Sequence, residues 1–309
     1  MTFIPPEWAR HKAMWTAWPS AADLWLEDLA PAREEVAAMI RALAEGEPVK
    51  VLAGSGEPLE SAKEALRGVA DVIEQPFGDI WLRDTAPIFS SPTQANLFRF
   101  NGWGEKYVLE GDDQVGERIA HFAGAKAVRH DFILEGGSVD MDGNGLCLTT
   151  RQCLLNPNRN KGWDQEKAEA ALKTALGAQK ILWLDEGLVG DHTDGHIDNI
   201  ARFVAPGKVV CQSASGADDP NAAILKRIEE SLRAMTDGQG KKLDVVTLPS
   251  PGLVTDDEGE VRAASHMNFI IGNTCVVVPA YNNRAEAAVA ALKALFPGRK
   301  VVAHAATAI

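Results

Sequence analysis

The sequence is poor in cysteine and has neither a long apolar run nor an excess of basic charge. Its 309 residues include four cysteines, none of them in a Cys-x-x-Cys pair, which excludes a disulfide scaffold and gives no sign of a zinc site. No apolar stretch approaches the roughly 18 residues that a membrane-spanning helix needs, and the start MTFIPPEWARHK lacks the basic-then-apolar order of a signal peptide. We therefore expect a cytoplasmic protein that does not enter a membrane.

Acidic residues outnumber basic ones by 43 to 31, so the formal net charge is −12. This balance disfavours nucleic acid or an anionic membrane surface as a partner and permits a small cationic substrate, although acidity also serves simple solubility. Hydrophobic residues at 46% and charged residues at 24% are ordinary for a globular protein. No linker divides the chain, so we expect one domain over residues 1–309, and homo-oligomer formation is compatible with the sequence.

A repeated unit runs through the chain, and each copy contains an amphipathic helix, a short apolar strand, a polar loop and a β-hairpin. Apolar residues at helical spacing predict helices at 32–46, 58–69, 112–124, 163–177, 220–235 and 283–298. The strands that follow these helices are VKVLAG, ADVIEQ, KAVRHDF, KILWLD, LDVVTLP and KVVAHAA. Hairpin turns are predicted at Pro92-Thr93, Gly143-Asn144, Pro206-Gly207 and Gly272-Asn273.

A polar cluster stands at the entrance of each hairpin. The clusters run from Trp81 to Asp84, from Glu135 to Gly137, from His192 to Asp198 and from Ser265 to Asn268. Steps of roughly 50 to 70 residues between clusters are typical of propellers and repeat arrays. If the related units surround an axis, all four clusters converge on one central site.

The segment from Asp191 to Asp198 is the densest cluster and allows more than one interpretation. In a helix, His192 and His196 would share a face with metal-ligand spacing, and Asp198 would be a third ligand. Gly195 and the β-rich continuation IDNIARFVAPGKVV favour a strand, on which His196 and Asp198 share one face. We prefer an acid/base histidine beside a carboxylate, with a metal site and a plain surface loop as alternatives.

The other clusters carry weaker signals when each is taken alone. Arg83 and Asp84 have the pattern of a local salt bridge or turn cap, but the neighbouring Trp81 offers a flat apolar wall to a planar cation. Glu135 precedes two glycines, which supply either turn geometry or close approach of the backbone to a ligand. Asn268 opens a hairpin, where asparagine is commonly a turn residue.

Taken together, the motifs carry a family resemblance. In order from about residue 8 onward, the chain contains WTAWPS, FGDIWLRDTAP, FNGWG, LEGGSVDMDGNG, CLLNPNRN, DGHIDNIARF and SHMNFIIGN. This series resembles the agmatine deiminase and bacterial-type peptidylarginine deiminase family of the guanidino-group-modifying superfamily. The resemblance implies an α/β fold, a five-bladed pseudo-symmetric α/β propeller (pentein) with the active site on the central axis.

The resemblance also implies roles for the polar residues. Asp84 and Asp198 would hold the planar guanidinium of the substrate, since carboxylates can accept paired hydrogen bonds from its nitrogens. Trp81 would line the pocket. Glu135 would pair with the catalytic His196, which would protonate the departing ammonia and later activate water.

Three further residues are implied on the substrate side. Asn268 matches a residue near the substrate in the peptidylarginine branch, and Trp103 matches the aromatic residue of the family's FNAWGG loop. His192 stands where the agmatine branch often has an acid suited to the far amine of its substrate. The resemblance therefore leaves agmatine, peptidylarginine and other guanidino compounds open as substrates.

The family's nucleophile is a cysteine in a C-terminal loop of the type GGGxxHCxTQQ, and this sequence ends at HAATAI, in the expected strand before that loop. We expect the loop to follow Ile309, and the alternative is a non-catalytic relative that binds guanidinium. Cys147, Cys211 and Cys275 fall in the second strands of hairpins and Cys153 just after one. We expect all four to be small buried hydrophobic residues.

The expected function is that of a guanidine hydrolase, or deiminase. It would convert agmatine into N-carbamoylputrescine and ammonia through a cysteine-thiouronium intermediate, in putrescine and polyamine biosynthesis, with no metal and no organic cofactor. The rivals are a deiminase of peptidylarginine or another guanidino compound, a guanidinium-binding protein without activity, and a metal-dependent hydrolase built on His192, His196 and Asp198.

Overall fold

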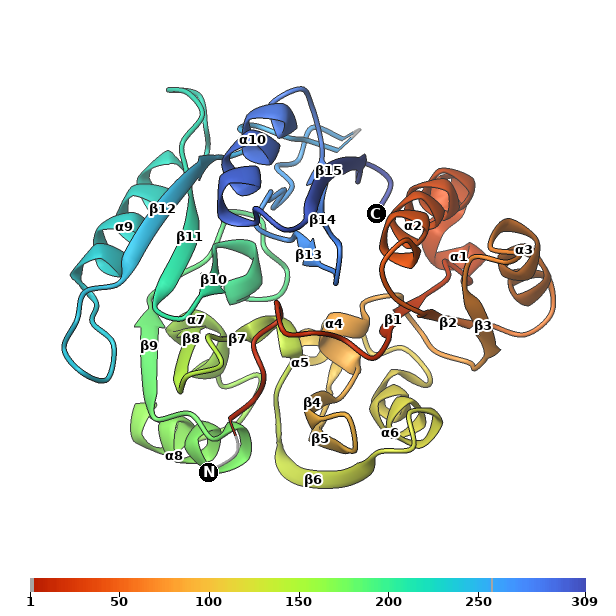
Figure 1. Ribbon diagram of the computed structural model, residues 1–309, viewed down its shortest axis with the longest axis horizontal. Coiled ribbons are helices and arrows are strands. Elements are labelled where there is room, and N and C mark those ends of the chain that lie inside the picture. Colours follow the sequence, from red (N-terminus) through yellow and green to blue (C-terminus); the bar gives the residue numbers. More distant parts are fainter. Residues whose placement is uncertain (1–2, 257) are drawn as a thin grey trace.

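Five three-stranded sheets follow one another along the chain, and each is built from three consecutive strands. The computed structural model describes residues 3–256 and 258–309. The sheets lie around the middle of the molecule in chain order (Figure 1). The protein is therefore an α/β protein made of five related units.

The first unit pairs all its strands in parallel: β1 (Met14–Ala17), β2 (Val49–Ala53) and β3 (Asp71–Glu74). Parallel neighbours need a long crossover. Here α1 (Ala22–Trp25), η1 (Leu26–Asp28) and α2 (Leu29–Ala44) connect β1 to β2, and α3 (Glu57–Ala65) connects β2 to β3. This unit has no hairpin, and the four-residue strand β1 carries no signal from which the sequence predicts it.

The other four units each combine an antiparallel hairpin with a parallel third strand. Their strands are β4 (Ile88–Ser91), β5 (Gln94–Arg99) and β6 (Lys126–Ile133); β7 (Val139–Met141), β8 (Leu146–Thr150) and β9 (Lys180–Leu184); β10 (Ala201–Ala205), β11 (Lys208–Ser213) and β12 (Asp244–Pro249); and β13 (Ile270–Ile271), β14 (Cys275–Ala280) and β15 (Lys300–Ala305). All four predicted turns lie between the strands of these hairpins and are confirmed.

One long helix packs in each of these units, between the second and third strands. The helices are α6 (Asp112–Phe122), α8 (Gln165–Leu176), α9 (Ala222–Ala234) and α10 (Ala285–Leu295), and all four were predicted from apolar spacing. In α9, for example, Leu225, Ile228 and Leu232 form the buried stripe. No helix in the described ranges is long and apolar enough to cross a membrane.

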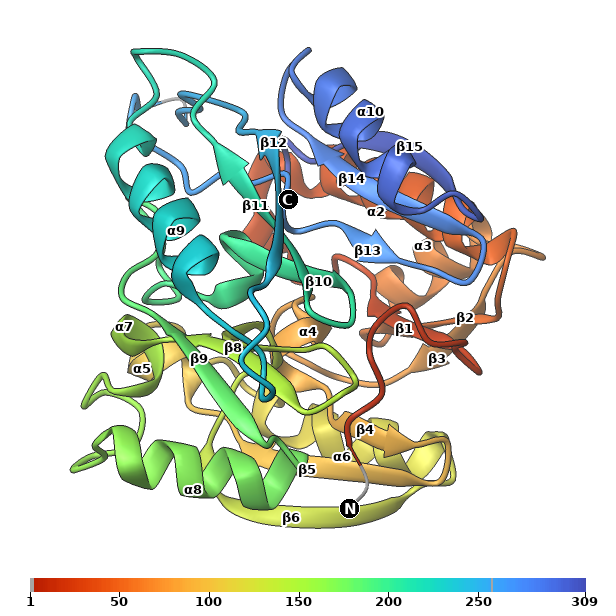
Figure 2. The same cartoon turned by 60° about the vertical axis from the view of Figure 1, so that its left-hand side comes forward.

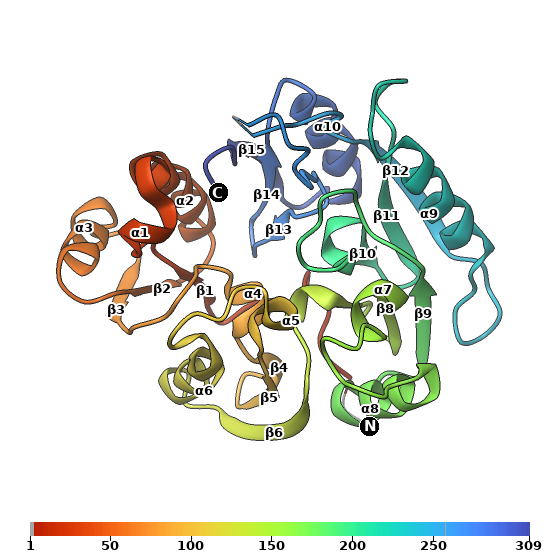
Figure 3. The same cartoon turned by 180° about the vertical axis from the view of Figure 1, so that it is seen from behind.

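Short helical turns occupy the hairpin entrances where the polar clusters were predicted. They are α4 (Leu82–Thr85), η2 (Gly136–Ser138) and η3 (Ile197–Asn199), and two more, α5 (Gly102–Glu105) and α7 (Arg151–Leu154), lie nearby. Figure 3 shows α4 and α5 near the centre of the molecule. The predicted strand through His196 and Asp198 is wrong, because Gly195 has a φ of 82° and the chain then enters the 3₁₀ turn η3.

The first and last units share one hydrophobic core. Cys275 and Val277 of β14 belong to the same buried cluster as Ile40 and Leu43 of α2. Because these residues come from opposite ends of the chain, their packing closes the arrangement of five units.

The segment before β1 crosses the middle of the molecule (Figure 1) and passes below β13 in the view of Figure 2. Its Glu7 forms ion pairs with Arg83 at 2.8 Å and with Arg202, and also accepts a hydrogen bond from the backbone N–H of Ile271 at 3.3 Å. Burial by itself would raise the pKa of this carboxyl. The charges of Arg202 and Arg83 outweigh burial and lower the pKa from 4.5 to about 2. One carboxylate thus joins the second, fourth and fifth units just beneath the hairpin entrances.

Candidate active site

Asp84 lies on α4, and both of its carboxylate oxygens are fixed by hydrogen bonds. The backbone N–H of Gly137 donates to Oδ1 at 2.9 Å, and the indole N–H of Trp103 donates to Oδ2 at 3.0 Å. Only 9% of the Asp84 side chain is exposed. A buried carboxylate with an N–H donor on each oxygen holds a fixed orientation.

His196 and Asp198 flank the same point from η3 of the fourth unit. Nδ1 of His196 lies 3.6 Å from Oδ1 of Asp84. A Cβ added to Gly137 would lie 2.6 Å from Nδ1 of His196 and 2.7 Å from both Oδ2 of Asp198 and Oδ1 of Asp84. The structure therefore brings three of the predicted site residues together, around a glycine that has no side chain to separate them.

The charges of this group influence one another strongly. Burial lowers the pKa of His196, but the neighbouring Asp84, Cys153 and Glu135 outweigh it and raise that pKa well above the ordinary value. Burial raises the pKa of Asp198 to about 6, the like charge of Asp84 adds to this, and His196 opposes it. Two carboxylates beside one imidazole in a water-poor setting form a site prepared for a cation.

Glu135 is fully buried, and its partner differs from the predicted one. It forms an ion pair with Arg159, whose Nε lies 2.6 Å from Oε1, and no ion pair with His196 occurs among the described residues. Nη1 of Arg159 also lies 2.7 Å from Oδ2 of Asp194, and Nη2 donates to the carbonyl of Thr193 at 3.0 Å. Arg159 thus connects Glu135 to the loop that carries His196.

Arg159 is a site residue that the sequence analysis missed. It belongs to the CLLNPNRN motif that contributes to the family resemblance, but nothing in that motif says what its arginine contacts. The side chain is fully buried, and its guanidinium donates to Glu135, Asp194, Thr193 and also to the side chain of Asn158 at 2.9 Å. Its partners outside this motif come from two other polar clusters, and only the three-dimensional arrangement shows this.

Cys153 is buried, as predicted, but it is not surrounded only by apolar groups. Its sulfur, one nitrogen of His196 and one oxygen of Glu135 all lie within 4.8 Å of one another. Burial raises the pKa of the Cys153 thiol, while the neighbouring His196 lowers it in part. The description of Cys153 as a plain hydrophobic residue is therefore incomplete.

The predicted aromatic residues have different settings. Trp103 is buried, contacts Phe100 edge-on and adopts a left-handed backbone with φ of 53°, which aims its indole N–H at Asp84. Trp81 is 40% exposed, directly before α4. Its exposed indole leaves a face available to a planar cation, and its place beside the substrate stays a prediction.

Asn268 lies on the exposed side of the site, where its side-chain N–H₂ donates a hydrogen bond to the side chain of Asn199. Asn199 is the last residue of η3, immediately after Asp198. Asn268 therefore connects the fifth unit to the turn that carries His196 and Asp198.

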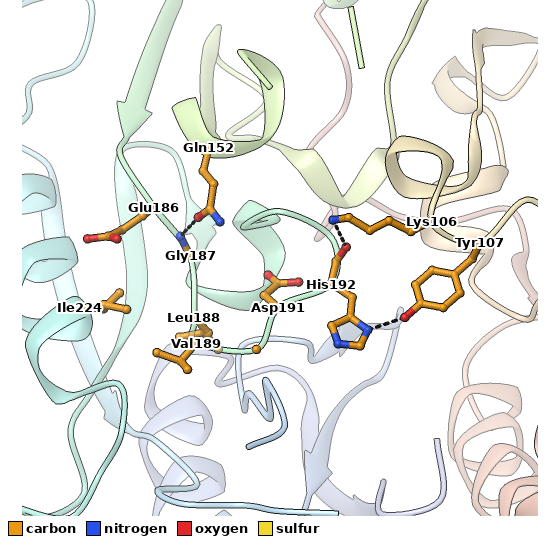
Figure 4. A pocket seen from close by; sticks show the side chains of 11 residues that line it. Lys106, Tyr107, Gln152, Glu186, Gly187, Leu188, Val189, Asp191, His192 and Ile224 are labelled. Carbon is orange, nitrogen blue, oxygen red and sulfur yellow. Dashed lines mark hydrogen bonds between the residues drawn. The ribbon is translucent and has the colours of Figure 1, made fainter. Parts of the chain in front are cut away.

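His192 lies at the outer end of the same loop and is exposed. Its Nδ1 is 2.6 Å from the hydroxyl oxygen of Tyr107, and the two rings are stacked (Figure 4). Lys106 donates to the backbone carbonyl of His192 at 2.8 Å. The alternative metal set of His192, His196 and Asp198 is not assembled within the described ranges, because His192 faces Tyr107 instead.

A pocket of about 600 Å³ borders His192, and Lys106, Tyr107, Glu186 and Asp191 are among its lining residues (Figure 4). None of the buried residues Asp84, Glu135, His196 and Asp198 lines this pocket. This pocket therefore lies beside the buried polar group and not at it.

Five related α/β units, with two carboxylates and an imidazole brought together at their entrances, agree with the deiminase class of C–N hydrolases that the sequence resemblance implies. A sequence profile of the Porphyromonas-type peptidyl-arginine deiminase family matches residues 3–309. The chain belongs to this family.

Characterised relatives and solved structures agree with this placement. The agmatine deiminase of Stutzerimonas stutzeri is 36% identical over 97% of this chain and 89% of its own length. The structure of the agmatine deiminase of Enterococcus faecalis superposes with a TM-score of 0.92 at 30% identity, over 99% of this chain and 91% of that one. A substrate-bound C315S agmatine deiminase from C. jejuni gives a TM-score of 0.87 at 27% identity, over 99% and 91% of the two chains.

Proposed function

We propose that the protein is an agmatine deiminase, which hydrolyses agmatine to N-carbamoylputrescine and ammonia and so serves putrescine and polyamine biosynthesis. The observation that carries this proposal is the convergence of Asp84, Asp198 and His196 around Gly137. Its support from outside the chain is the similarity to agmatine deiminases over nearly the whole length.

The fold belongs to the same proposal. Five units in chain order, with their polar entrances toward the middle, fit a five-bladed pseudo-symmetric α/β propeller of the pentein type with its active site on the central axis. The domain would then span residues 1–309 as a single body. The second to fifth units deliver their polar residues from hairpin entrances, and in this way side chains more than 100 positions apart in the sequence would meet.

Asp84 and Asp198 would grip the guanidinium of the substrate. A guanidinium is planar and carries its donors at fixed angles, so two facing carboxylates can fix both its position and its plane. The raised pKa of Asp198 in the empty site would fall when the cation arrives, because the repulsion from Asp84 is then compensated. Trp81 would cover one face of the group, with Trp103 holding Asp84 in place and Asn268 at the rim.

His196 would move the protons of the reaction. A thiolate attacks the central guanidinium carbon and forms a C–S bond; the C–N bond then breaks, and His196 gives its proton to the departing ammonia. His196 next accepts one proton from water, whose oxygen bonds to the same carbon. The C–S bond then breaks, the thiolate is regenerated, and the remaining hydroxyl proton passes to solvent as the carbonyl forms. The raised pKa of His196, opposed by burial but favoured by Asp84, keeps it protonated for the first of these steps.

The thiolate is the part of this proposal that rests on the family resemblance alone. The family's GGGxxHC motif does not occur in the sequence, and all four cysteines that do occur are buried. Cys153 is the one beside His196, but its sulfur has no exposed surface from which to reach a substrate carbon.

A second substrate class is favoured by one specific observation, the setting of His192. The groups at the outer end of the loop are His192, Tyr107 and Lys106, and Lys106 is ion-paired with Asp194 at 2.6 Å. Position 192 therefore offers the far amine of agmatine no free carboxylate. Arginine in a peptide, or another guanidino compound with a carboxylate or carbonyl at its far end, suits this edge better. The carboxylates of Asp191 and Glu186, which line the pocket next to His192, would instead suit the far amine of agmatine.

The test is an ammonia-release assay on the protein as expressed from its gene, with agmatine, free arginine and a blocked arginine peptide as parallel substrates. The proposal expects turnover of agmatine at the highest kcat/KM and its loss in Asp84→Asn. Preference for the blocked peptide would mean that the substrate is peptidylarginine and not agmatine. Tight binding of agmatine without ammonia from any substrate would make the protein a guanidinium-binding relative without activity.

A further inference from the structure

We propose that Glu135, Cys153 and His196 form a binding site for a soft divalent metal ion, with Zn²⁺ as the expected occupant. One donor atom from each of the three side chains lies within 4.8 Å of the other two. The residues are 0%, 0% and 2% exposed. A carboxylate, a thiolate and an imidazole are the kinds of ligand that zinc takes in proteins.

Two atoms of this cluster have no hydrogen-bond partner in the described structure: Oε2 of Glu135 and Nε2 of His196. Buried polar atoms are almost always paired, since an unpaired one loses its water without compensation. A cation among the three side chains would pair both atoms at once. This is the second observation, independent of the cluster itself, that points to a ligand.

The surrounding residues already hold two of the donors in place. Arg159 binds Oε1 of Glu135 at 2.6 Å, which leaves Oε2 free in a fixed position. Asp84 faces Nδ1 of His196 at 3.6 Å, which leaves Nε2 free on the opposite side of the ring. A carboxylate behind the second nitrogen of a metal-binding histidine is the usual arrangement in metalloproteins.

Distance and charge both fit a zinc-sized ion. Donors around tetrahedral zinc are separated by about 3.5 Å, so a cluster within 4.8 Å needs only a modest contraction. Asp84 and Asp198 add negative charge nearby, and the positive charge of Arg159 is already matched by Glu135 and Asp194. Binding would release two protons, one from the Cys153 thiol and one from Nε2 of His196, since the thiolate and the neutral imidazole are the forms that bind a metal.

The bound metal would be an inhibitor of the reaction proposed above, because it would occupy the histidine that moves the proton. This consequence rests on the proposed function, but the binding itself does not. The site differs from the predicted set of His192, His196 and Asp198, since it uses Cys153 and Glu135 in place of His192 and Asp198.

Cobalt(II) is a suitable probe, because a cobalt–thiolate bond gives a charge-transfer band in the near ultraviolet. The wild-type protein is expected to bind one equivalent of Co²⁺ with this band and to lose the band when Zn²⁺ is added. Cys153→Ser should abolish the band. Cys211→Ser, a matched control at a buried cysteine of β11, should leave it unchanged.

A wild-type protein without the band, or a Cys153→Ser variant that keeps it, would overturn the proposal. Should Cys153→Ser fail to fold, Glu135→Gln decides: it keeps the thiolate, so the band should persist while affinity for Co²⁺ falls by about tenfold or more. Unchanged affinity in Glu135→Gln would also refute the site. Ammonia release is therefore assayed on the metal-free protein before Co²⁺ is added. A metal-free protein that releases no ammonia but develops the band once Co²⁺ is added would refute the proposed function and leave the metal site standing.

Discussion

The backbone N–H of Gly137 donates a hydrogen bond to Oδ1 of Asp84 at 2.9 Å. This bond joins η2 of the third unit to α4 of the second, and the indole of Trp103 fixes the other oxygen of the same carboxylate. The orientation of Asp84 is therefore set by the fold before any ligand arrives. Groups that need no reorganisation on binding are the ones that stabilise a charged substrate most effectively.

Gly137→Ala should abolish most of the activity. The added Cβ would lie within 2.7 Å of Asp84, Asp198 and His196, so all three side chains would have to move. A displacement of about 1 Å at a reacting centre can cost roughly 100-fold in rate, and we expect a fall in kcat of at least about this size. Gly298→Ala is the matched control, since no atom lies within 4 Å of its added Cβ. Ammonia release by Gly137→Ala at the wild-type rate would show that the reaction occurs elsewhere.

Asp198→Asn should remove turnover while leaving the protein as stable as before, or more stable, at neutral pH. Burial and the like charge of Asp84 raise the pKa of Asp198 from 3.8 to about 6 in the folded protein. Its contribution to stability is therefore fully present below the lower value and is lost as the pH rises through the higher one. An asparagine side chain is neutral at every pH, so the variant does not lose stability in this way as the pH rises.

The measurement is urea-induced unfolding of both proteins at about pH 4 and pH 7. The difference in free energy of unfolding should favour the variant at the higher pH and be smaller at the lower one. A variant that unfolds much more easily at neutral pH, yet still releases ammonia, would show that Asp198 is structural.

Arg159→Ala should destabilise the protein and also reduce its activity. Removing one partner of a buried ion pair typically costs about 3–5 kcal/mol, because the other charge is left without compensation; here Glu135 would be left in that state. Arg99→Ala provides the control, since the pair between Arg99 and Asp131 is exposed and should contribute almost nothing. If thermal unfolding finds the two variants equally stable, Arg159 does not hold the site together.

Much of the fold was predictable because its signals are local. Turn dipeptides such as Gly143-Asn144 and Pro206-Gly207 determine their own backbone geometry, and helical spacing of apolar residues needs only the segment itself. The strand β1 gave no such signal, since it is four residues long and pairs with β2 only across a long helical crossover. The 3₁₀ turn at Asp198 was not predicted, because the β-rich sequence after it suggested that the strand begins before Asp198. The positive φ of Gly195 turns the chain into η3 instead.

The site was predictable in its residues but not in its contacts. Asp84, Asp198 and His196 could be named from their motifs, and the repeat indicated that they would meet. Arg159 could not be assigned a partner, because Glu135 lies in another unit. The contact between Cys153 and His196 could not be predicted either, because the spacing of residues along the chain does not show which side chains from different units come together.

Glu7→Gln should reveal how the central charge network contributes to stability. Burial alone would raise the pKa of Glu7, but Arg202 and Arg83 bring it down from 4.5 to about 2 in the folded protein. A carboxyl with a lowered folded pKa stabilises the protein above its unfolded value, and this stability is lost as the pH falls toward the folded value. The variant should therefore unfold at clearly lower urea concentration at neutral pH, with the difference shrinking steadily between about pH 4.5 and pH 2.

Glu57→Gln separates this effect from the loss of any ion-paired carboxyl. Arg33 also lowers the pKa of Glu57, but this carboxylate is largely exposed, so water and salt screen the pair. Its replacement should shift the unfolding midpoint only slightly at any pH.

Glu7 is bonded to groups from three units, and one of them, Arg83, directly precedes Asp84. The loss of Glu7 should therefore also lower the activity. Equal urea midpoints for wild type and Glu7→Gln at neutral pH would mean that the five units are held together without this network.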